Sequence, residues 1–336
     1  MADLDSQQVK EQAGAKSVGR SYHKERKVEI IVDSTADFAP GLSERLGVEV
    51  IPFSCITPEG EKFDDMWQSQ SSHDFYETMR QNPKVHYSTC AVSPGRYYEV
   101  FERYAKAGKP TLYMGLAEGL SSSINNARQA QAMIEEAYPD FELRVLDMHV
   151  DSAAGMLLAL EVARLAEQDL SIDELVVWAE DAANFIHGYF TLDNFDALAA
   201  GGRIPPAAAH IGGKLDIKPE LSFDNTGALT LRGMCRGRKK ALRAILQDFR
   251  ENYAHDPSLP LAIVSSDAEK DADWLEKEIR KEKGCEGITI IRSQLSPILG
   301  SHTGPDMVAL CFWGVDRRDK VSLTDRIARK VRRQQQ

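Results

Sequence analysis

Short runs of mainly apolar residues recur through the first half of the chain. They lie at residues 28–32, 48–53, 111–114 and 143–146. Strands that are apolar along nearly their whole length are buried on both faces, as in a parallel sheet, whereas alternating strands keep one face in solvent. The pattern therefore predicts buried parallel strands before residue 150.

Helical patterns lie between these strands. Ser93 and Pro94 form a helix start signal, because Ser caps helices and Pro suits the first helical position. Apolar residues then follow at positions 97, 100, 101 and 104. A second apolar stripe, at positions 124, 127, 130 and 134, follows the serine run 121–123. Alternating strands and helices predict an open α/β sheet.

The second half has a different order of elements. Two consecutive helices are expected at 153–167 and 171–185, the second with a capping box formed by Ser171 and Glu174. Further strands are expected at 189–192, 215–223, 228–234, 261–264, 288–291 and 308–312, and a further helix at 238–253. The turn sequence 225–227 is typical of a hairpin. Hairpin strands mixed with helices predict an α+β domain with a mainly antiparallel sheet.

These patterns divide the chain into two domains, an α/β domain at 28–150 and an α+β domain at 151–315. Residues 1–27 lack a hydrophobic period and are expected to form a mobile N-terminal extension. Residues 316–336 are rich in Arg and Lys beside a narrow apolar stripe, which predicts a basic C-terminal helix. Such a helix either contacts an anionic membrane or partner, or packs as a solvated helix on the body of the protein.

Composition and charge narrow the function classes. The 336 residues carry 41 basic and 51 acidic side chains, a net charge of −10. This balance disfavours nucleic acid as a main partner, because phosphate contacts dominate such affinity. No stretch approaches the ~18 apolar residues that span a bilayer, and no apolar segment typical of a secretory signal opens the chain, so a cytoplasmic location is expected. The five cysteines form no CxxC pair, which disfavours a disulfide framework or a zinc site.

Common catalytic and nucleotide-binding motifs are absent from the sequence. It contains no GxxxxGKS or GxxxxGKT, no GxGxxG after the first strand, no GxSxG and no HExxH. The fingerprints of Walker-type ATP sites, dinucleotide sites, α/β hydrolases and zinc proteases are therefore missing. We expect no cofactor and no metal, and the pattern favours a binding protein over an enzyme.

Hydroxyl-bearing segments follow three of the predicted strands, at 33–35, 88–93 and 121–123. Ligands of open α/β sheets bind outside the carboxyl ends of the strands. The last two segments also lead into helix N-termini, which favour anions. One interpretation is a carboxylate or phosphate site built from hydroxyls and amides, and the other is a set of ordinary helix caps.

Three further features carry candidate chemistry. Gly201 and Gly202 permit a sharp turn beside Arg203, whose guanidinium either reaches an anion or makes a surface ion pair. His302 falls in an expected polar loop between two strands, where it either orients an acid or is a surface residue. A short basic cluster includes Arg236, Arg238 and Lys239. This basic cluster either docks an acidic partner or is simply solvated.

The order of short motifs along the chain resembles the DegV family of bacterial fatty-acid-binding proteins. The motifs are Ile-Val-Asp33-Ser34-Thr35-Ala-Asp37, Val-Ile-Pro52, Phe63-Asp64-Asp65, the segment from Thr89 to Pro94, Leu120-Ser121-Ser122-Ser123, Leu146-Asp147, Gly201-Gly202-Arg203-Ile204, Lys218-Pro219, Arg236-Gly237-Arg238-Lys239 and His302-Thr303-Gly304-Pro305. The resemblance covers about residues 28–315. Each motif is weak alone, and their shared order makes the match specific.

The resemblance implies a two-domain α/β protein that holds one long-chain fatty acid in a slit between or beneath its domains. In such families a separate kinase of the dihydroxyacetone-kinase type phosphorylates the carboxyl group of the acid, and the acyl phosphate enters phospholipid synthesis. The resemblance therefore implies a lipid carrier subunit that acts with a fatty acid kinase and is not itself an enzyme.

The resemblance also implies residue roles. Thr89, Ser121 and Ser122 match the family's carboxylate-binding loops. Arg203 and His302 match the family's Arg and His near the head group, where they would orient the acid. The basic cluster is the candidate surface for docking the kinase.

Two departures from the family pattern bear on the ligand. Cys90-Ala91-Val92 replaces a more polar loop, and Ser122 replaces a glycine that would let the backbone approach the ligand. Either change alters chain selectivity or indicates a different acyl ligand. An alternative of another class is a self-sufficient acyl or phosphoester hydrolase or transferase that uses Ser121 and His302.

Overall fold

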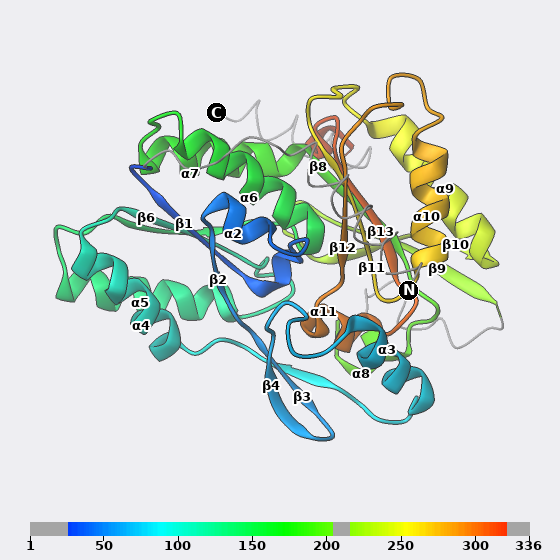
Figure 1. Cartoon of the computed structure of the whole chain (residues 1–336), viewed down its shortest axis with the longest axis horizontal. Helices are drawn as coiled ribbons and strands as arrows, with labels where there is room; N and C mark the ends of the chain where they lie inside the picture. Colours follow the sequence, from blue (N-terminus) through cyan, green and yellow to red (C-terminus); the bar gives the residue numbers. More distant parts are fainter. Residues whose placement is uncertain (1–25, 204–215, 321–336) are drawn as a thin grey trace, which may run out of the picture.

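The computed structural model of the chain describes residues 26–203 and 216–320, which form two large sheets, a small third sheet and the helices around them (Figure 1). The N-terminal extension expected at 1–27 lies almost wholly outside the described residues. Of the basic helix expected at 316–336, the structure describes only the beginning, where Arg317–Lys320 form a 3-10 turn.

The first sheet is parallel, as its apolar strands predict. Its strands β2 (Glu49–Ile51), β1 (Glu29–Asp33), β6 (Thr111–Gly115) and β7 (Leu143–Asp147) lie in that order, and every neighbouring pair is parallel. The helices of this half are α2 (Leu42–Leu46), α3 (Ser72–Gln81), α4 (Pro94–Ala107) and α5 (Ser123–Ala137). Successive residues of the central strands are buried on opposite faces, Ile31 towards α4 and α5, and Ile30 and Val32 towards the other side. This two-sided burial explains why the strands read as continuous apolar runs.

The second sheet has six strands and is mainly antiparallel. Its order is β10 (Leu229–Arg236), β9 (Ile217–Phe223), β8 (Ile186–Thr191), β13 (Val308–Trp313), β11 (Leu261–Ser265) and β12 (Ile290–Gln294), with β11 and β12 its one parallel pair. The helices of this half are α6 (Ser152–Ala166), α7 (Ile172–Ala182), α8 (Asp196–Ala200), α9 (Arg238–Asn252), α10 (Glu269–Ile279) and α11 (Pro297–Thr303). The predicted fold class, a parallel α/β part followed by a mainly antiparallel α+β part, is confirmed.

A small antiparallel sheet was not predicted. Strands β4 (Gly60–Phe63), β3 (Ser54–Thr57) and β5 (Ser88–Cys90) pair in that order, with Cys55 opposite Thr89. The strands are short and largely exposed, so they lack the apolar pattern that revealed the other two sheets. The pairing matters for function because it places Thr89 on a strand and not in a free loop.

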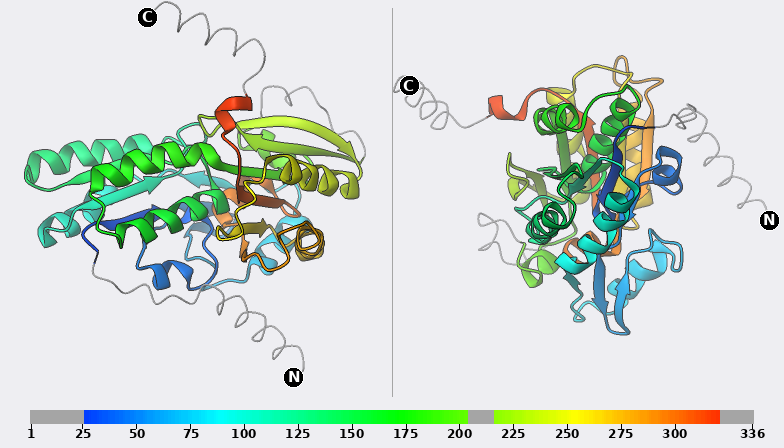
Figure 2. Two further views of the ribbon diagram at one scale, coloured as in Figure 1. Left: turned by 90° about the horizontal axis from the view of Figure 1, so that it is seen from above. Right: turned by 90° about the vertical axis from the view of Figure 1, so that its left-hand side faces the viewer.

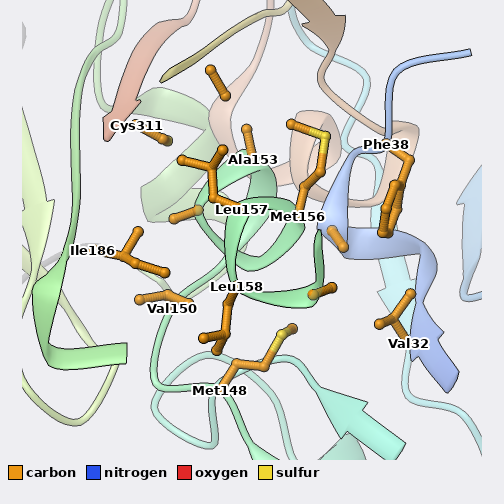
Figure 3. Packing of buried hydrophobic residues seen from close by; sticks show 14 of the residues in the cluster. Val32, Phe38, Met148, Val150, Ala153, Met156, Leu157, Leu158, Ile186 and Cys311 are labelled. Carbon is orange, nitrogen blue, oxygen red and sulfur yellow. The ribbon is translucent and has the colours of Figure 1, made fainter. Parts of the chain in front are cut away.

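Helix α6 lies between the two large sheets and joins them. Nearly all of its residues are buried, and it packs against β1 of the first sheet and against β8, β11 and β13 of the second. Figure 3 shows Leu158 of α6 beside Met148, while Ala153 and Leu157 lie towards Cys311 and Ile186 of the second sheet. One continuous core therefore runs through both halves, and the two further views show the sheets and their helices in close contact (Figure 2).

The segment around His302 is a helix, so the expectation of a polar loop there is wrong. Ser296 caps α11 by accepting a hydrogen bond from the Leu299 N–H at 3.3 Å, and Pro297 takes the first helical position. Both are ordinary start signals, but the helix is only 7 residues long and too short to show a periodic pattern. Helix α11 packs against α8 and against α3, β3 and β5 of the first half.

In the described part of the chain, no helix combines the length and the apolar character that a transmembrane span requires.

Candidate functional site

A cavity of about 280 Å³ lies where the small sheet, the first sheet's loops, α8, α11 and the second sheet meet. Most of its lining is apolar, with side chains such as Phe53, Leu116, Phe190, Phe223 and Ile298. The polar side chains on the lining are Thr89, Ser121, Ser122, Asp151, Ser152, Arg203, His302 and Thr303. All five residues predicted for the head group therefore border one cavity, although they are spread over more than 200 positions of the chain.

Thr89 and His302 form a direct contact at the polar end. The Thr89 hydroxyl and the His302 Nε2 atom are 2.9 Å apart. Strand β5 supplies Thr89, and α11, which packs on β5, supplies His302. The two halves of the chain thus contribute one residue each to this pair.

His302 is held neutral by its surroundings. Burial, with a smaller contribution from the positive charge of Arg203, lowers the pKa of His302 to about 4. Its Nδ1 atom is buried and has no hydrogen-bond partner among the described residues. Gly201 makes this placement possible, because a Cβ atom there would lie only 2.2 Å from Nδ1. Of the two glycines before Arg203, Gly201 is therefore the one that lets the imidazole of His302 pack closely against the backbone.

The serine run lies at the start of α5. The Ser121 hydroxyl accepts a hydrogen bond from the Ser123 N–H at 3.2 Å and donates one to the Ser123 hydroxyl at 3.1 Å. Ser122 is the N-cap residue, is exposed, and makes no side-chain bond to the helix. A carboxylate next to these residues would meet hydroxyl groups and the positive end of the α5 dipole.

Arg203 lies at the exposed edge of the cavity. Its Nη1 atom donates to the Gly201 carbonyl at 2.5 Å, and its Nε atom approaches the Leu120 carbonyl at 3.4 Å. These contacts hold the guanidinium between the end of α8 and the serine run. A fixed positive charge beside a neutral imidazole and two serines suits an anionic head group.

The segment 33–35 does not reach the cavity but supports its wall. Asp33 is fully buried and accepts hydrogen bonds from the Leu116 N–H at 2.7 Å and the Tyr113 hydroxyl at 3.2 Å. The Ser34 hydroxyl accepts from the Phe53 N–H at 3.2 Å. Because Leu116 and Phe53 line the cavity, this motif positions apolar wall residues and does not contact the ligand space itself.

The basic cluster is not part of the cavity lining and lies around the junction of β10 and α9. Arg236 and Lys239 are exposed. Arg238 is half-buried, donating to the Asp271 carboxylate at 2.7 Å and to the Asp306 carbonyl at 2.6 Å. Of the three predicted docking residues, Arg238 therefore has a structural role within this fold.

The geometry around His302 does not form the Ser121–His302 pair that the alternative hydrolase or transferase would use. Ser121 bonds Ser123 and not His302, and a histidine with a pKa near 4 is a weak general base at neutral pH. Residues 26–203 and 216–320 contain no group of three or more His, Cys, Asp or Glu side chains arranged to hold a metal ion.

Sequence reasoning missed two features of the site. One is the apolar lining, which comes from both halves and cannot be read from one segment. The other is Asp151, a carboxylate on the lining that directly precedes the apolar helix α6. A charged residue in front of a nearly uncharged helix was the available signal.

Comparisons with known proteins agree with this architecture. The family model described as "Uncharacterised protein, DegV family" matches residues 27–314. A DegV domain-containing protein of Clostridium perfringens is 31% identical over 289 residues, which cover 86% of this chain and 98% of the relative. Among solved structures, DegV of Bacillus subtilis, described as a fatty acid binding protein, has a TM-score of 0.73 at 23% identity and covers 86% of this chain and 99% of its own. A stearic acid-binding protein of Eubacterium ventriosum has a TM-score of 0.75 at 23% identity, with coverages of 88% and 100%.

Proposed function

This chain belongs to the DegV family, and we propose that it binds one long-chain fatty acid in the cavity, with the carboxylate held by Thr89, Ser121 and Ser122. One observation carries the proposal: an otherwise mainly apolar cavity has hydroxyls, an imidazole and a guanidinium gathered at one end. The fatty-acid binding described for the solved proteins of the same fold supports it.

The two parts of the cavity divide the work of binding. Burial of the acyl chain supplies affinity, at ~0.8 kcal/mol for each CH₂ group removed from water. Hydrogen bonds from hydroxyls to the carboxylate fix the orientation of the ligand, and Arg203 balances its charge. A neutral His302 donates or accepts a hydrogen bond without adding a second buried charge.

We further propose that a separate kinase phosphorylates the bound acid and that this chain acts as its carrier. Arg203 supports this step because it is exposed at the edge of the cavity, where it can offset charge as an acyl phosphate forms. Arg236 and Lys239 are exposed and form the part of the basic cluster left for contact with a partner.

Native mass spectrometry of the purified protein, followed by denaturing extraction and lipid analysis, tests the ligand. We expect about one fatty acid per chain. A protein that is empty and also fails to take up added fatty acids would contradict the proposed function.

Fatty-acid binding should take up protons at pH values just above the His302 pKa of about 4. A carboxylate beside His302 counters the positive potential of Arg203, so it raises the low pKa of the imidazole in the complex. A group whose pKa rises on binding favours the complex as pH falls. Calorimetry in two buffers of different ionisation enthalpy measures the uptake, which His302→Gln should abolish. Equal uptake in the two proteins would contradict this assignment.

Arg203→Ala should reduce kinase-dependent phosphorylation more than lipid retention. The side chain is exposed and its described bonds are to carbonyl groups, so the fold does not depend on it. Retention is measured by lipid extraction and phosphorylation by acyl phosphate formation with the cognate kinase. Arg96→Ala, which removes an exposed arginine outside the cavity, is the matched control. Equal losses of retention and phosphorylation in Arg203→Ala would show that Arg203 only helps to bind the fatty acid and has no separate role in phosphorylation.

A further inference from the structure

Asp151 places a carboxylate on the cavity lining, although a saturated hydrocarbon chain has no group that would bind it. It is half-buried and lines the cavity together with Phe223, Leu229 and Cys311. It also occupies the N-cap position of α6, where an Asp normally accepts a hydrogen bond from the helix. Here the side chain makes no capping bond.

The protein gives the Asp151 carboxylate few stabilising interactions. Among the described residues, the donor to this carboxylate is the backbone N–H of Asp151 itself. Arg317 exerts a favourable electrostatic effect, but its guanidinium donates to the carbonyls of Phe223, Asp224 and Ala183. Burial raises the pKa of Asp151 to about 7. A carboxylate on a mainly apolar lining loses part of its hydration when an acyl chain fills the cavity, so the site favours a ligand that supplies a donor.

The spacing of residues along β13 shows where Asp151 lies along the length of the cavity. Met307, Ala309 and Cys311 all line the cavity, as expected for alternate residues on one face of a strand. Four residues at about 3.3 Å each put Met307 and Cys311 about 13 Å apart.

The two ends of this strand lie at opposite ends of the site. The Ser266 hydroxyl connects the Gly304 carbonyl to the Met307 N–H, so Met307 lies beside the end of α11 that carries His302. Cys311 lies at the start of α6, where the Ala154 N–H bonds its thiol, and burial together with the charge of Asp151 raises the pKa of that thiol. Asp151 is therefore at the end remote from the head group.

We propose that Asp151 makes this cavity selective for acyl chains that carry a hydroxyl group near the middle of the chain. The proposal rests on the proposed fatty-acid binding and names the class of fatty acid. An extended chain advances about 1.2 Å per bond, a third of the rise of an extended residue. About 13 Å from the head group therefore corresponds to a hydroxyl near the tenth to twelfth carbon.

A hydroxyl fits this position better than an amine. A cation would lose its hydration in the apolar cavity and would meet the positive charge of the nearby Arg317. A neutral hydroxyl brings one donor to the carboxylate at a much smaller desolvation cost. Ser152 supplies no competing donor, because its hydroxyl bonds to the Asp37 carboxylate.

The test compares octadecanoic acid with its 10-hydroxy, 12-hydroxy and 3-hydroxy derivatives by displacement of a fluorescent fatty acid. At pH 8, above the Asp151 pKa of about 7, the full-length protein should bind the 10-hydroxy or the 12-hydroxy acid about tenfold more tightly than octadecanoic acid, as expected for a hydrogen bond to a charged group. The 3-hydroxy acid should show no such preference, because its hydroxyl lies near the head group.

Asp151→Leu should abolish the preference and improve binding of octadecanoic acid. Leu229→Met, a volume-conserving change on the same lining, is the control and should keep the preference. Asp151→Asn covers the case in which the leucine variant does not fold; a neutral amide is a weaker acceptor and should reduce the preference.

The outcomes separate this inference from the proposed function. If the protein binds octadecanoic acid at least as well as the hydroxy acids, the role of Asp151 is overturned while fatty-acid binding stands. The role is also overturned if Asp151→Leu and Asp151→Asn keep the preference. Binding of none of the acids overturns both proposals.

Discussion

A protein with Thr89→Val and Ser121→Ala together should bind fatty acids at least about a hundredfold more weakly than the parent protein. Each change removes one hydroxyl at the polar end of the cavity, and a hydrogen bond to a charged group contributes about 1.5–3 kcal/mol. Valine keeps the shape of threonine on β5, so the apolar part of the cavity should remain intact. Isothermal titration calorimetry with octadecanoic acid measures the change in affinity.

The fold should tolerate this double change. Thr89 and Ser121 are only half-buried, and their described side-chain partners are His302 and Ser123. Ser88→Ala is the matched control, since Ser88 lies next to Thr89 on β5 but is exposed and outside the lining. Unchanged affinity in the double variant, with unchanged unfolding temperature, would show that the carboxylate lies elsewhere.

The sequence predicted the large sheets because their strands carry strong local patterns. Residues 28–32 and 111–114 are apolar on both faces and coincide with β1 and β6, and Ser171 with Glu174 forms the predicted capping box. The small sheet has no such pattern. In β4, Glu61 and Lys62 stand beside an exposed Phe63, so its pairing depends on tertiary contacts that no local window contains.

The site was predictable in part because several of its residues belong to short sequence motifs. Motif order identified Thr89, Ser121, Arg203 and His302, and the structure gathers all of them at one cavity. The Thr89–His302 contact joins residues 213 positions apart, so neither its existence nor the α11 helix behind it could be read from spacing. Asp151 carries a local signal, a charge directly before the apolar helix α6, but its place on the cavity lining depends on neighbours from distant segments.

Asp37→Ala should cost roughly 3 kcal/mol of folding free energy and weaken ligand binding as well. Asp37 is buried and accepts a hydrogen bond from the Ser296 N–H at 2.7 Å and another from the Ser152 hydroxyl. It thus ties the first strand's turn to the starts of α6 and α11. Alanine leaves two buried donors without an acceptor, at about 1–3 kcal/mol each. Urea unfolding followed by circular dichroism measures the loss.

Asp37→Asn separates the hydrogen bonds from the charge. Asparagine keeps an acceptor for Ser296, and the Ser152 hydroxyl can rotate to accept from the amide, so at low pH this variant should be nearly as stable as the parent protein. Burial raises the pKa of Asp37 well above its ordinary value, so the folded protein holds a proton that the unfolded chain releases. That contribution to stability is present at low pH and is lost as pH rises through the folded-state pKa. The asparagine variant should therefore gain stability relative to the parent as pH rises from 4 to 8. A pH-independent difference between the two proteins would mean that the carboxyl group of Asp37 does not titrate differently in the folded and unfolded states.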